Sequence, residues 1–325
     1  MSVIEVNNLN KIFKIKIKHK GFKEKMKYLF RNEYKKKHAV NNISFNIEEG
    51  ESVAFIGPNG AGKSTTIKML TGILFPSGGD IKVLGYNPSS DRKKLTYEIG
   101  SVFGQKEQLW VHLTPYENIK FFGTIYDVKK DELEKRIEEL SELFQIKSFI
   151  NQPVKSLSLG QRMKCEMVAS LLHNPKVLFF DEPTIGLDPI AKETLRKLIK
   201  KINKELKTTI LFTSHDVGDI EEVCKRVIII NDGKIVLDDS MKNLKYHYLN
   251  KKLVEVKLKK DLKIEEKEGI KVLKHKNSAY EIEVDMDKSS VDELLNLFKA
   301  DDLLDISISS TPLEEIIKDI YRKDE

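Results

Sequence analysis

Apolar residues occur along the chain either in short continuous runs, which predict strands, or at every third or fourth position, which predicts helices. Two short runs are almost wholly apolar, as is typical of strands buried on both faces of a sheet: residues 52–56 and 177–180. Three longer segments have an apolar residue every three or four positions, which predicts helices over residues 129–149, about 160–173 and 191–206. Buried strands that alternate with such helices predict an α/β fold.

Shorter apolar or alternating runs predict further strands. They cover residues 2–6, 11–18, 39–47, 209–213, 227–231 and 234–237. An Asn-rich break separates the first run from the second. Asp232 and Gly233 lie between the last two runs and favour a tight hairpin turn.

Toward the C-terminus the pattern changes from long helices to short mixed elements. Strand-like runs occur at residues 254–258, 279–284 and 306–309. Two short helices between and after them are marked by capping-box pairs, Ser290 with Glu293 and Thr311 with Glu314. Pro312 takes the first helical position of the second helix.

The length of 325 residues is sufficient for two hydrophobic cores. We expect a large domain over residues 1–240 and a small α+β accessory or regulatory domain over residues 241–325. No run of eighteen or more uncharged apolar residues occurs, and the N-terminus lacks the pattern of a secretory signal, so no membrane span is expected. Cys165 and Cys224 have no second ligand at metal-binding spacing, which favours reduced cysteines in the cytosol.

The net charge of +6 is concentrated in one basic segment. Between residues 11 and 38 the chain has eleven Lys and one Arg against two Glu. Apolar residues recur in it at helical spacing: Phe22, Met26, Leu29 and Phe30. This spacing predicts a short amphipathic helix, and a basic insert at about residues 14–37 can contact anionic lipid headgroups or an acidic partner. A solvated charged hairpin fits the same residues.

A glycine-rich loop follows the buried strand 52–56 and opens the next helix. It has the G-x-x-x-x-G-K-[ST] pattern, and we expect phosphate binding by Gly57, Pro58, Asn59, Gly60, Ala61, Gly62, Lys63, Ser64 and Thr65. The glycines let backbone N–H groups point toward phosphate oxygens, and the helix N-terminus adds the positive end of its dipole. Lys63 supplies a mobile ammonium group, and Ser64 can place its hydroxyl on Mg²⁺.

A second carboxylate-bearing segment follows the other buried strand, 177–180. Asp181 and Glu182 come directly after it and before Pro183. In open α/β folds, ligands bind outside the carboxyl ends of parallel strands. Asp181 is therefore expected to hold Mg²⁺, and Glu182 is placed to polarise the attacking water. Together with the phosphate loop, this pair predicts an NTPase.

Further motifs indicate which class of NTPase this is. The signature segment, Leu-Ser-Leu-Gly-Gln-Arg at residues 157–162, precedes the Asp-Glu pair and opens a helix. Gln105 lies between the phosphate loop and the signature segment, whereas Asp188 and His215 follow the carboxylates. In this order the motifs resemble the ABC ATPase family over about residues 1–240. The resemblance implies a P-loop NTPase core of ABC type, with a mixed sheet, an antiparallel β subdomain and a helical signature subdomain.

The resemblance also implies a split active site. In that family two subunits pack head to tail, and the signature segment of one closes over the ATP held by the other. Ser158, Gly160 and Gln161 are then expected to contact nucleotide across the interface, and Asp188 to link the two sites. Leu159 departs from the usual Leu-Ser-Gly-Gly-Gln, but its backbone N–H survives, so its side chain must point away from the phosphate.

By the same resemblance, the remaining site residues receive roles within one subunit. Gln105 completes the Mg²⁺ shell and His215 contacts the γ-phosphate beside Glu182. An aromatic residue stacks on adenine near the end of the first strand, where Phe13 fits best and Tyr34 is the alternative.

The segment after Gln105 contains the single tryptophan of the chain, Trp110. In the family this region forms the groove for a cytoplasmic helix of the membrane subunit, and Trp is over-represented among binding hot spots. A tryptophan of the core is the alternative interpretation.

Together these features predict the ATP-hydrolysing subunit of an ABC transporter, with ATP and Mg²⁺ as cofactors. It is expected to dimerise head to tail at the cytoplasmic face of the membrane and to drive a separate permease. The basic insert and the signature segment resemble an exporter-type branch, so export is favoured over import. A nucleic-acid-associated ABC ATPase is a further alternative, since basic segments also bind phosphate backbones.

Overall fold

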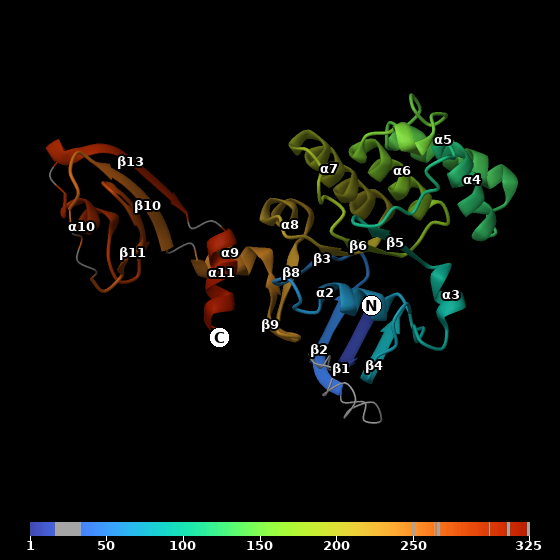
Figure 1. Cartoon of the computed structure of the whole chain (residues 1–325), viewed down its shortest axis with the longest axis horizontal. Coiled ribbons are helices and arrows are strands. Elements are labelled where there is room, and N and C mark those ends of the chain that lie inside the picture. Colours follow the sequence, from blue (N-terminus) through green and yellow to red (C-terminus); the bar gives the residue numbers. More distant parts are fainter. Residues whose placement is uncertain are drawn as a thin grey trace, which may run out of the picture. The chain divides into compact units, whose positions relative to one another are not determined.

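The computed structural model describes residues 1–16, 34–248, 251–262, 264, 267–298, 300–310 and 313–323. The chain forms two compact units, Met1–Asp238 and Asp239–Glu325 (Figure 1). The helix predicted around Phe22 to Phe30 lies outside the described residues, as do Thr311 and Pro312 of the second capping box. Within the described ranges, no helix combines the length and apolar content that crossing a bilayer requires.

A six-stranded sheet forms the centre of the first unit. Its strands lie in the order β5 (Ile99–Phe103), β6 (Val177–Asp181), β7 (Thr209–Thr213), β3 (Ser52–Ile56), β8 (Arg226–Asn231) and β9 (Lys234–Ser240). The strands from β5 to β8 in this order pair in parallel. β3 and β7 are buried along their whole length, which explains their continuous apolar sequences. Asp232 and Gly233 have positive φ, as a tight turn between β8 and β9 requires.

A three-stranded antiparallel sheet packs beside it, in the order β2 (Tyr34–Glu48), β1 (Ser2–Lys16) and β4 (Gly78–Val83). The predicted break in β1 is wrong, because one strand continues through the Asn-rich stretch. It does so by shifting register there, and Asn8 takes a left-handed φ of 49°. Phe45 and Phe55, with ring centroids 5.7 Å apart, lie in the core that the two sheets share.

The helices of the first unit connect and cover these strands. They are α2 (Lys63–Leu70), α3 (Arg92–Thr96), α4 (Pro115–Ile125), α5 (Lys130–Leu143), α6 (Leu159–Leu171), α7 (Pro189–Leu206) and α8 (Val217–Val223), with a 3₁₀ turn at Val154–Ser156. Figure 1 shows α4, α5 and α6 grouped on one side of the six-stranded sheet, with β1, β2 and β4 on the other. The first unit thus has the mixed sheet, antiparallel sheet and helical part that the sequence predicts.

The second unit contains a four-stranded antiparallel sheet, in the order β11 (Ile270–Lys276), β12 (Ala279–Asp285), β10 (Lys251–Leu258) and β13 (Leu303–Ser310). Its helical elements are α9 (Met241–Tyr248), α10 (Val291–Leu295), a 3₁₀ turn at Ala300–Asp302 and α11 (Leu313–Lys323). Alternate residues of β10 and β12 are buried with Leu294 and Phe298, so the unit has its own small core. The capping box of Ser290 and Glu293 begins α10 as predicted.

Candidate nucleotide-binding site

The glycine-rich loop joins the end of β3 to the start of α2. A Cβ at Gly57 would lie 2.1 Å from the carbonyl oxygen of Ile230, so a side chain there would collide with the backbone of β8. Gly62 has a φ of 115°, which favours glycine strongly. The loop therefore curls tightly at the carboxyl end of a central strand, with the N-terminus of α2 opening from it.

Lys63 is folded back into this loop. Its side chain is 5% exposed, and Nζ donates hydrogen bonds to the carbonyl oxygens of Gly57 at 2.7 Å and Pro58 at 3.2 Å. Burial lowers the pKa of Lys63, whereas the nearby carboxylates of Glu182 and Asp181 act to raise it. The ammonium group is thus positioned inside the loop by acceptors that phosphate oxygens can replace.

Ser64 and Asp181 come together at the neighbouring strand end. Ser64 Oγ donates to Asp181 Oδ1 at 3.2 Å, and Thr213 Oγ1 of β7 donates to the same oxygen at 2.8 Å. Hydroxyl and carboxylate oxygens are the ligands that Mg²⁺ prefers, and Mg²⁺ is usually held by few protein groups together with substrate phosphates. Among the described residues no cluster of three or more His, Cys, Asp or Glu could hold a metal alone. This donor set fits a magnesium ion that is shared with a nucleotide.

Glu182, next to Asp181, is held by further hydrogen bonds. Its Oε2 accepts from Gln105 Nε2 at 2.8 Å, and its Oε1 lies 2.5 Å from His215 Nε2. The Glu182 N–H donates to the carbonyl and hydroxyl oxygens of Thr213, both at 3.1 Å. Glu182 also has a φ of 56°, an uncommon conformation for a residue with a side chain and one that occurs often at functional sites. The structure therefore brings together all three residues predicted to be catalytic.

His215 is held in the turn between β7 and α8 by residues that sequence reasoning did not single out. Asp219, fully buried, accepts a hydrogen bond from Ser214 Oγ at 2.9 Å and pairs with Arg196 Nε at 2.5 Å. Asp216 caps α8 by accepting from the Gly218 N–H at 3.0 Å. The Asp216–x–x–Asp219 spacing at a helix start is a signal that could have pointed to this support.

The signature residues line a hollow to which no residue of the phosphate loop contributes. Ser158 caps α6 in a capping box with Gln161, with bonds of 3.2 and 2.9 Å, and Asp188 caps α7 by accepting from two N–H groups at 3.0 Å. These three residues and Gly160 line one hollow of about 270 Å³, and every residue that lines it comes from the segment 158–195. The predicted site residues thus form two groups, one around the phosphate loop and one around Ser158.

Leu159 does not face that hollow. Its Cδ2 lies 3.2 Å from where a Cβ would stand at Gly186, which has a φ of 73°. The leucine side chain therefore packs over the loop that ends at Asp188. This contact accounts for how leucine is accommodated at a position where the usual motif has glycine.

The two candidates for adenine contact lie on opposite faces of the β1–β2 hairpin. Phe13 is on the same face as Lys11, whose Nζ is 5.2 Å from the ring centroid. Lys11 pairs with Val40, whose side chain reaches within 3.4 Å of a Cβ position at Gly62. Tyr34 pairs with Lys16, three positions from Phe13, and so belongs to the other face.

Trp110 is a surface residue rather than a core residue. It is 48% exposed, and its ring packs edge-on against Phe121 and stacks on Phe122, with centroid distances of 4.3 and 6.0 Å. Leu113, Phe121 and Ile125 are exposed as well, so an apolar surface extends from Trp110 along α4. Surfaces of this kind mark contacts with partners.

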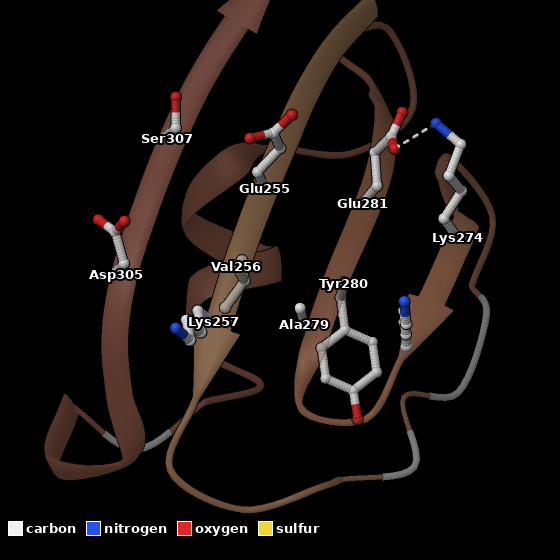
Figure 2. A pocket seen from close by; sticks show the side chains of 10 residues that line it. Glu255, Val256, Lys257, Lys274, Ala279, Tyr280, Glu281, Asp305 and Ser307 are labelled. Carbon is white, nitrogen blue, oxygen red and sulfur yellow. Dashed lines mark hydrogen bonds and ion pairs between the residues drawn. The ribbon is translucent and has the colours of Figure 1, made fainter.

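The second unit has a hollow of its own, of about 350 Å³, on one face of its sheet (Figure 2). Lys274 of β11 and Glu281 of β12 form an ion pair of 2.6 Å there, and Glu255 of β10 lies directly opposite Glu281. Other polar residues also line the hollow: Lys257, Lys276, Tyr280, Asp305 and Ser307. None of the residues predicted for nucleotide binding contributes to this hollow.

Comparison with known proteins decides the family. The profile of the ABC transporter family matches residues 40–185. The chain is 35% identical over 215 residues to the ABC transporter ATP-binding protein NatA of Bacillus subtilis, across 66% of this chain and 87% of NatA. The chain belongs to the ABC transporter family. It is an ATP-binding, ATP-hydrolysing subunit, which confirms the predicted enzyme class.

Other relatives and solved structures agree with this family. The chain is 36% identical to the linearmycin resistance ATP-binding protein LnrL of B. subtilis, across 62% of this chain and 65% of LnrL. It is 33% identical to the bacitracin transport ATP-binding protein BcrA of Bacillus licheniformis, across 69% of this chain and 72% of BcrA. The structure of cbiO1 from Clostridium perfringens, part of the cbiONQ transporter complex, has a TM-score of 0.62 at 30% identity, covering 75% and 90% of the two chains. The dimeric ADP- and phosphate-bound cassette MJ0796 has a TM-score of 0.61 at 26% identity, covering 73% and 98%. These neighbours confirm the predicted α/β fold of the ABC ATPase.

Proposed function

We propose that this ABC ATPase closes head to tail with a second copy around two ATP molecules and thereby drives a separate membrane permease. The observation that carries the proposal is the division of the site residues into two groups within one chain. The phosphate loop, Asp181 and Glu182 form one group, and Ser158, Gly160 and Asp188 form the other. The dimeric state of the similar MJ0796 cassette supports the same arrangement.

In this proposal the first group binds and hydrolyses the nucleotide. The loop and Lys63 hold the phosphates, Ser64 and Asp181 hold Mg²⁺, and bound Mg²⁺ neutralises charge on the transferring phosphoryl group. Glu182 polarises the attacking water. Gln105 and His215 each contact one of its carboxylate oxygens, and because each oxygen can accept a further hydrogen bond, they can orient Glu182 while it binds the water. Phe13 is the proposed adenine contact. It lies on the same face of β1 as Lys11, which pairs with Val40, and Val40 lies next to Gly62 of the phosphate loop.

The decisive test is trapping of the dimer by Glu182→Gln. The variant keeps the size and shape of the side chain but loses the carboxylate base, so it should form a stable dimer with ATP and Mg²⁺ in size-exclusion chromatography. Asp305→Asn, in the second unit, is the matched control and should elute as the wild type does. A Glu182→Gln protein that stays monomeric under these conditions contradicts the split site.

The permease is proposed to dock on the apolar surface around Trp110. Trp110→Ala should leave ATP binding intact but reduce recovery of the co-purified membrane partner, and full recovery would contradict this contact.

The residues of the basic insert that the structure describes include Lys14, Lys16 and Lys35 on the hairpin, and we propose that they contact anionic lipid at the cytoplasmic face of the membrane. Equal binding to anionic vesicles with and without residues 15–37 would exclude that role.

The direction of transport is proposed as export. The names of LnrL and BcrA, relatives concerned with linearmycin resistance and bacitracin transport, support it. Residues 241–325 are proposed to be an accessory or regulatory domain of the same subunit. Vesicles that contain the co-purified complex would decide the direction, since an exporter accumulates its substrate on the side opposite the added ATP.

A further inference from the structure

A buried polar cluster joins helix α6 to the six residues 105–110, here called the strap. Glu166 of α6 is 2% exposed, and its Oε1 accepts a hydrogen bond of 3.4 Å from the backbone N–H of Gln108. Arg162, one turn earlier on α6, has its Nε 3.9 Å from that oxygen, and its guanidinium also contacts Glu107 of the strap. Side chains and backbone from both elements therefore converge on one carboxyl group.

This cluster contains more polar atoms than it pairs. Gln108 Nε2, Arg162 Nε and Glu166 Oε2 are buried without a hydrogen-bond partner, and they are three of five such side-chain atoms in the described part of the chain. Two of the three are donors and one is an acceptor, so they complement one another. Because unpaired buried polar atoms are costly, the free energy of this cluster depends on how closely the strap lies against α6.

The strap is anchored elsewhere at both of its ends. At one end the Gln105 side chain donates to Glu182, which belongs to the group of site residues around the phosphate loop. At the other end the Trp110 N–H donates to Asn118 Oδ1 at 2.8 Å, and the Trp110 carbonyl accepts from Asn118 Nδ2 at 3.1 Å. Asn118 is fully buried in α4, so water does not compete for its hydrogen bonds with Trp110. Glu166 holds the middle of a segment whose first residue contacts the proposed base.

We propose that Glu166 is a positioning residue for ATP hydrolysis, tying the strap to α6 so that movement of the signature helix changes how Gln105 holds Glu182. The proposal rests on the roles proposed above for Gln105 and Glu182. The tie is strongest when the carboxylate is charged, because a charged acceptor binds the Gln108 N–H and Arg162 more strongly than a neutral one. Burial raises the pKa of Glu166 to about 7; Glu107 reinforces the shift, whereas the Gln108 N–H and Arg162 oppose it. The tie should therefore weaken as the pH falls below 7.

The test compares steady-state ATP hydrolysis by the wild type, Glu166→Gln and Glu166→Leu. Glu138→Gln is the matched control, because Glu138 is exposed and its ion pair with Lys147 lies at the surface. At pH 8 we expect kcat to fall about threefold in Glu166→Gln and about tenfold in Glu166→Leu, with KM for ATP within about twofold of wild type. At pH 6 the wild type and Glu166→Gln should become similar. Amide hydrogen exchange at Gln108, measured at pH 8, should be faster in both variants than in the wild type.

The outcomes separate this proposal from the one it rests on. Unchanged kcat together with unchanged exchange at Gln108 in both variants overturns the role of Glu166. If Gln105→Ala retains full activity, the role of Gln105 fails, while the exchange at Gln108 still reports whether Glu166 holds the strap. Glu166→Gln has the same size as the native residue, so it carries the test if Glu166→Leu does not fold.

Discussion

At the residue scale, the placement of Gln105 beside Glu182 depends on an unusually close approach between the backbones of Gly104 and Glu182. A Cβ at Gly104 would lie 2.0 Å from the carbonyl oxygen of Glu182, closer than real Cβ contacts come. Gly104 directly precedes Gln105, whose side chain reaches the Glu182 carboxylate. Only glycine therefore lets the start of the strap lie against the turn that carries the proposed base.

Replacing this glycine should disturb catalysis more than binding. In Gly104→Ala the methyl group must push Gln105 and Glu182 apart, and a displacement of about 1 Å can cost on the order of a hundredfold in rate. We expect kcat to fall by about tenfold to a hundredfold, while ATP binding measured by fluorescence titration changes little. Gly78→Ala is the control, because its nearest neighbour would be Asn10 Cβ at 4.0 Å. A Gly104→Ala enzyme with normal kcat would show that the close approach is dispensable.

Glu166 should also make stability depend on pH in a direction opposite to that of most carboxylates. Burial raises its pKa from 4.5 to about 7, so between these values the folded chain binds more protons than the unfolded chain. Its contribution to stability therefore falls as the pH rises from 4.5 to 7. Glu166→Gln should match the wild type near pH 4.5 and be more stable by up to about 3 kcal/mol at pH 8. Urea unfolding at both pH values measures this, and a less stable variant at pH 8 would contradict it.

Individual site residues were predictable where a motif fixes both residue type and element. Lys63, Ser64, Asp181 and Glu182 lie where a strand–loop–helix and a buried parallel strand must place them. Glu166 was not predictable, because a glutamate in an amphipathic helix is usually solvated. Its burial depends on how α6 packs against the strap, which is a tertiary contact that no local pattern encodes.

At the element scale, the sheet of the second unit carries an electrostatic defect. Glu255 of β10 and Glu281 of β12 are directly opposite in an antiparallel pair, and like charges in that position are destabilising. Lys274 relieves Glu281 with an ion pair from the other side. Figure 2 shows the two glutamates on the same face of the sheet.

Reversing the charge of Glu255 should therefore stabilise this sheet. Glu255→Lys replaces a repulsive cross-strand pair with an attractive one, which is worth about 0.2–1 kcal/mol. Amide hydrogen exchange in β12 should slow by the corresponding factor. Lys257→Glu should have the opposite effect, because Lys257 lies opposite Asp305. Unchanged exchange in Glu255→Lys would mean that the two carboxylates do not interact, and faster exchange would contradict a net stabilisation.

Elements were predicted well where burial is continuous and poorly where turn chemistry competes with periodicity. Strands β3 and β7 have the predicted bounds. Helix α5 ends at Leu143 rather than 149, because Gln145 turns left-handed with a φ of 56° while Ile146 and Phe149 are still buried without helical structure. Helix α4 was missed, although Thr114, Pro115 and Glu117 form a capping box with proline at its start.

At the scale of the whole molecule, the proposed head-to-tail dimer would make each subunit contribute half of two sites. Twofold symmetry would place the Lys63 group of each copy against the Ser158 group of its partner. Homodimers of Lys63→Ala have two damaged phosphate loops, and homodimers of Ser158→Ala have two damaged signature segments. Either variant alone should therefore hydrolyse ATP at a small fraction of the wild-type rate.

Mixing the two variants should restore activity if the sites are shared between chains. A mixed dimer has one site in which both residues are altered and one in which an intact Lys63 meets an intact Ser158. With random exchange half of the dimers are mixed, so the equimolar mixture should reach about a quarter of the wild-type rate if the two sites act independently. The double variant Lys63→Ala/Ser158→Ala mixed with wild type is the control: its mixed dimers have no intact site, so only the wild-type homodimers, a quarter of all dimers, should be active, whereas chains that act alone would give half of the wild-type rate. If each chain hydrolysed ATP by itself, the single variants would stay inactive on mixing, and the symmetric arrangement would be wrong.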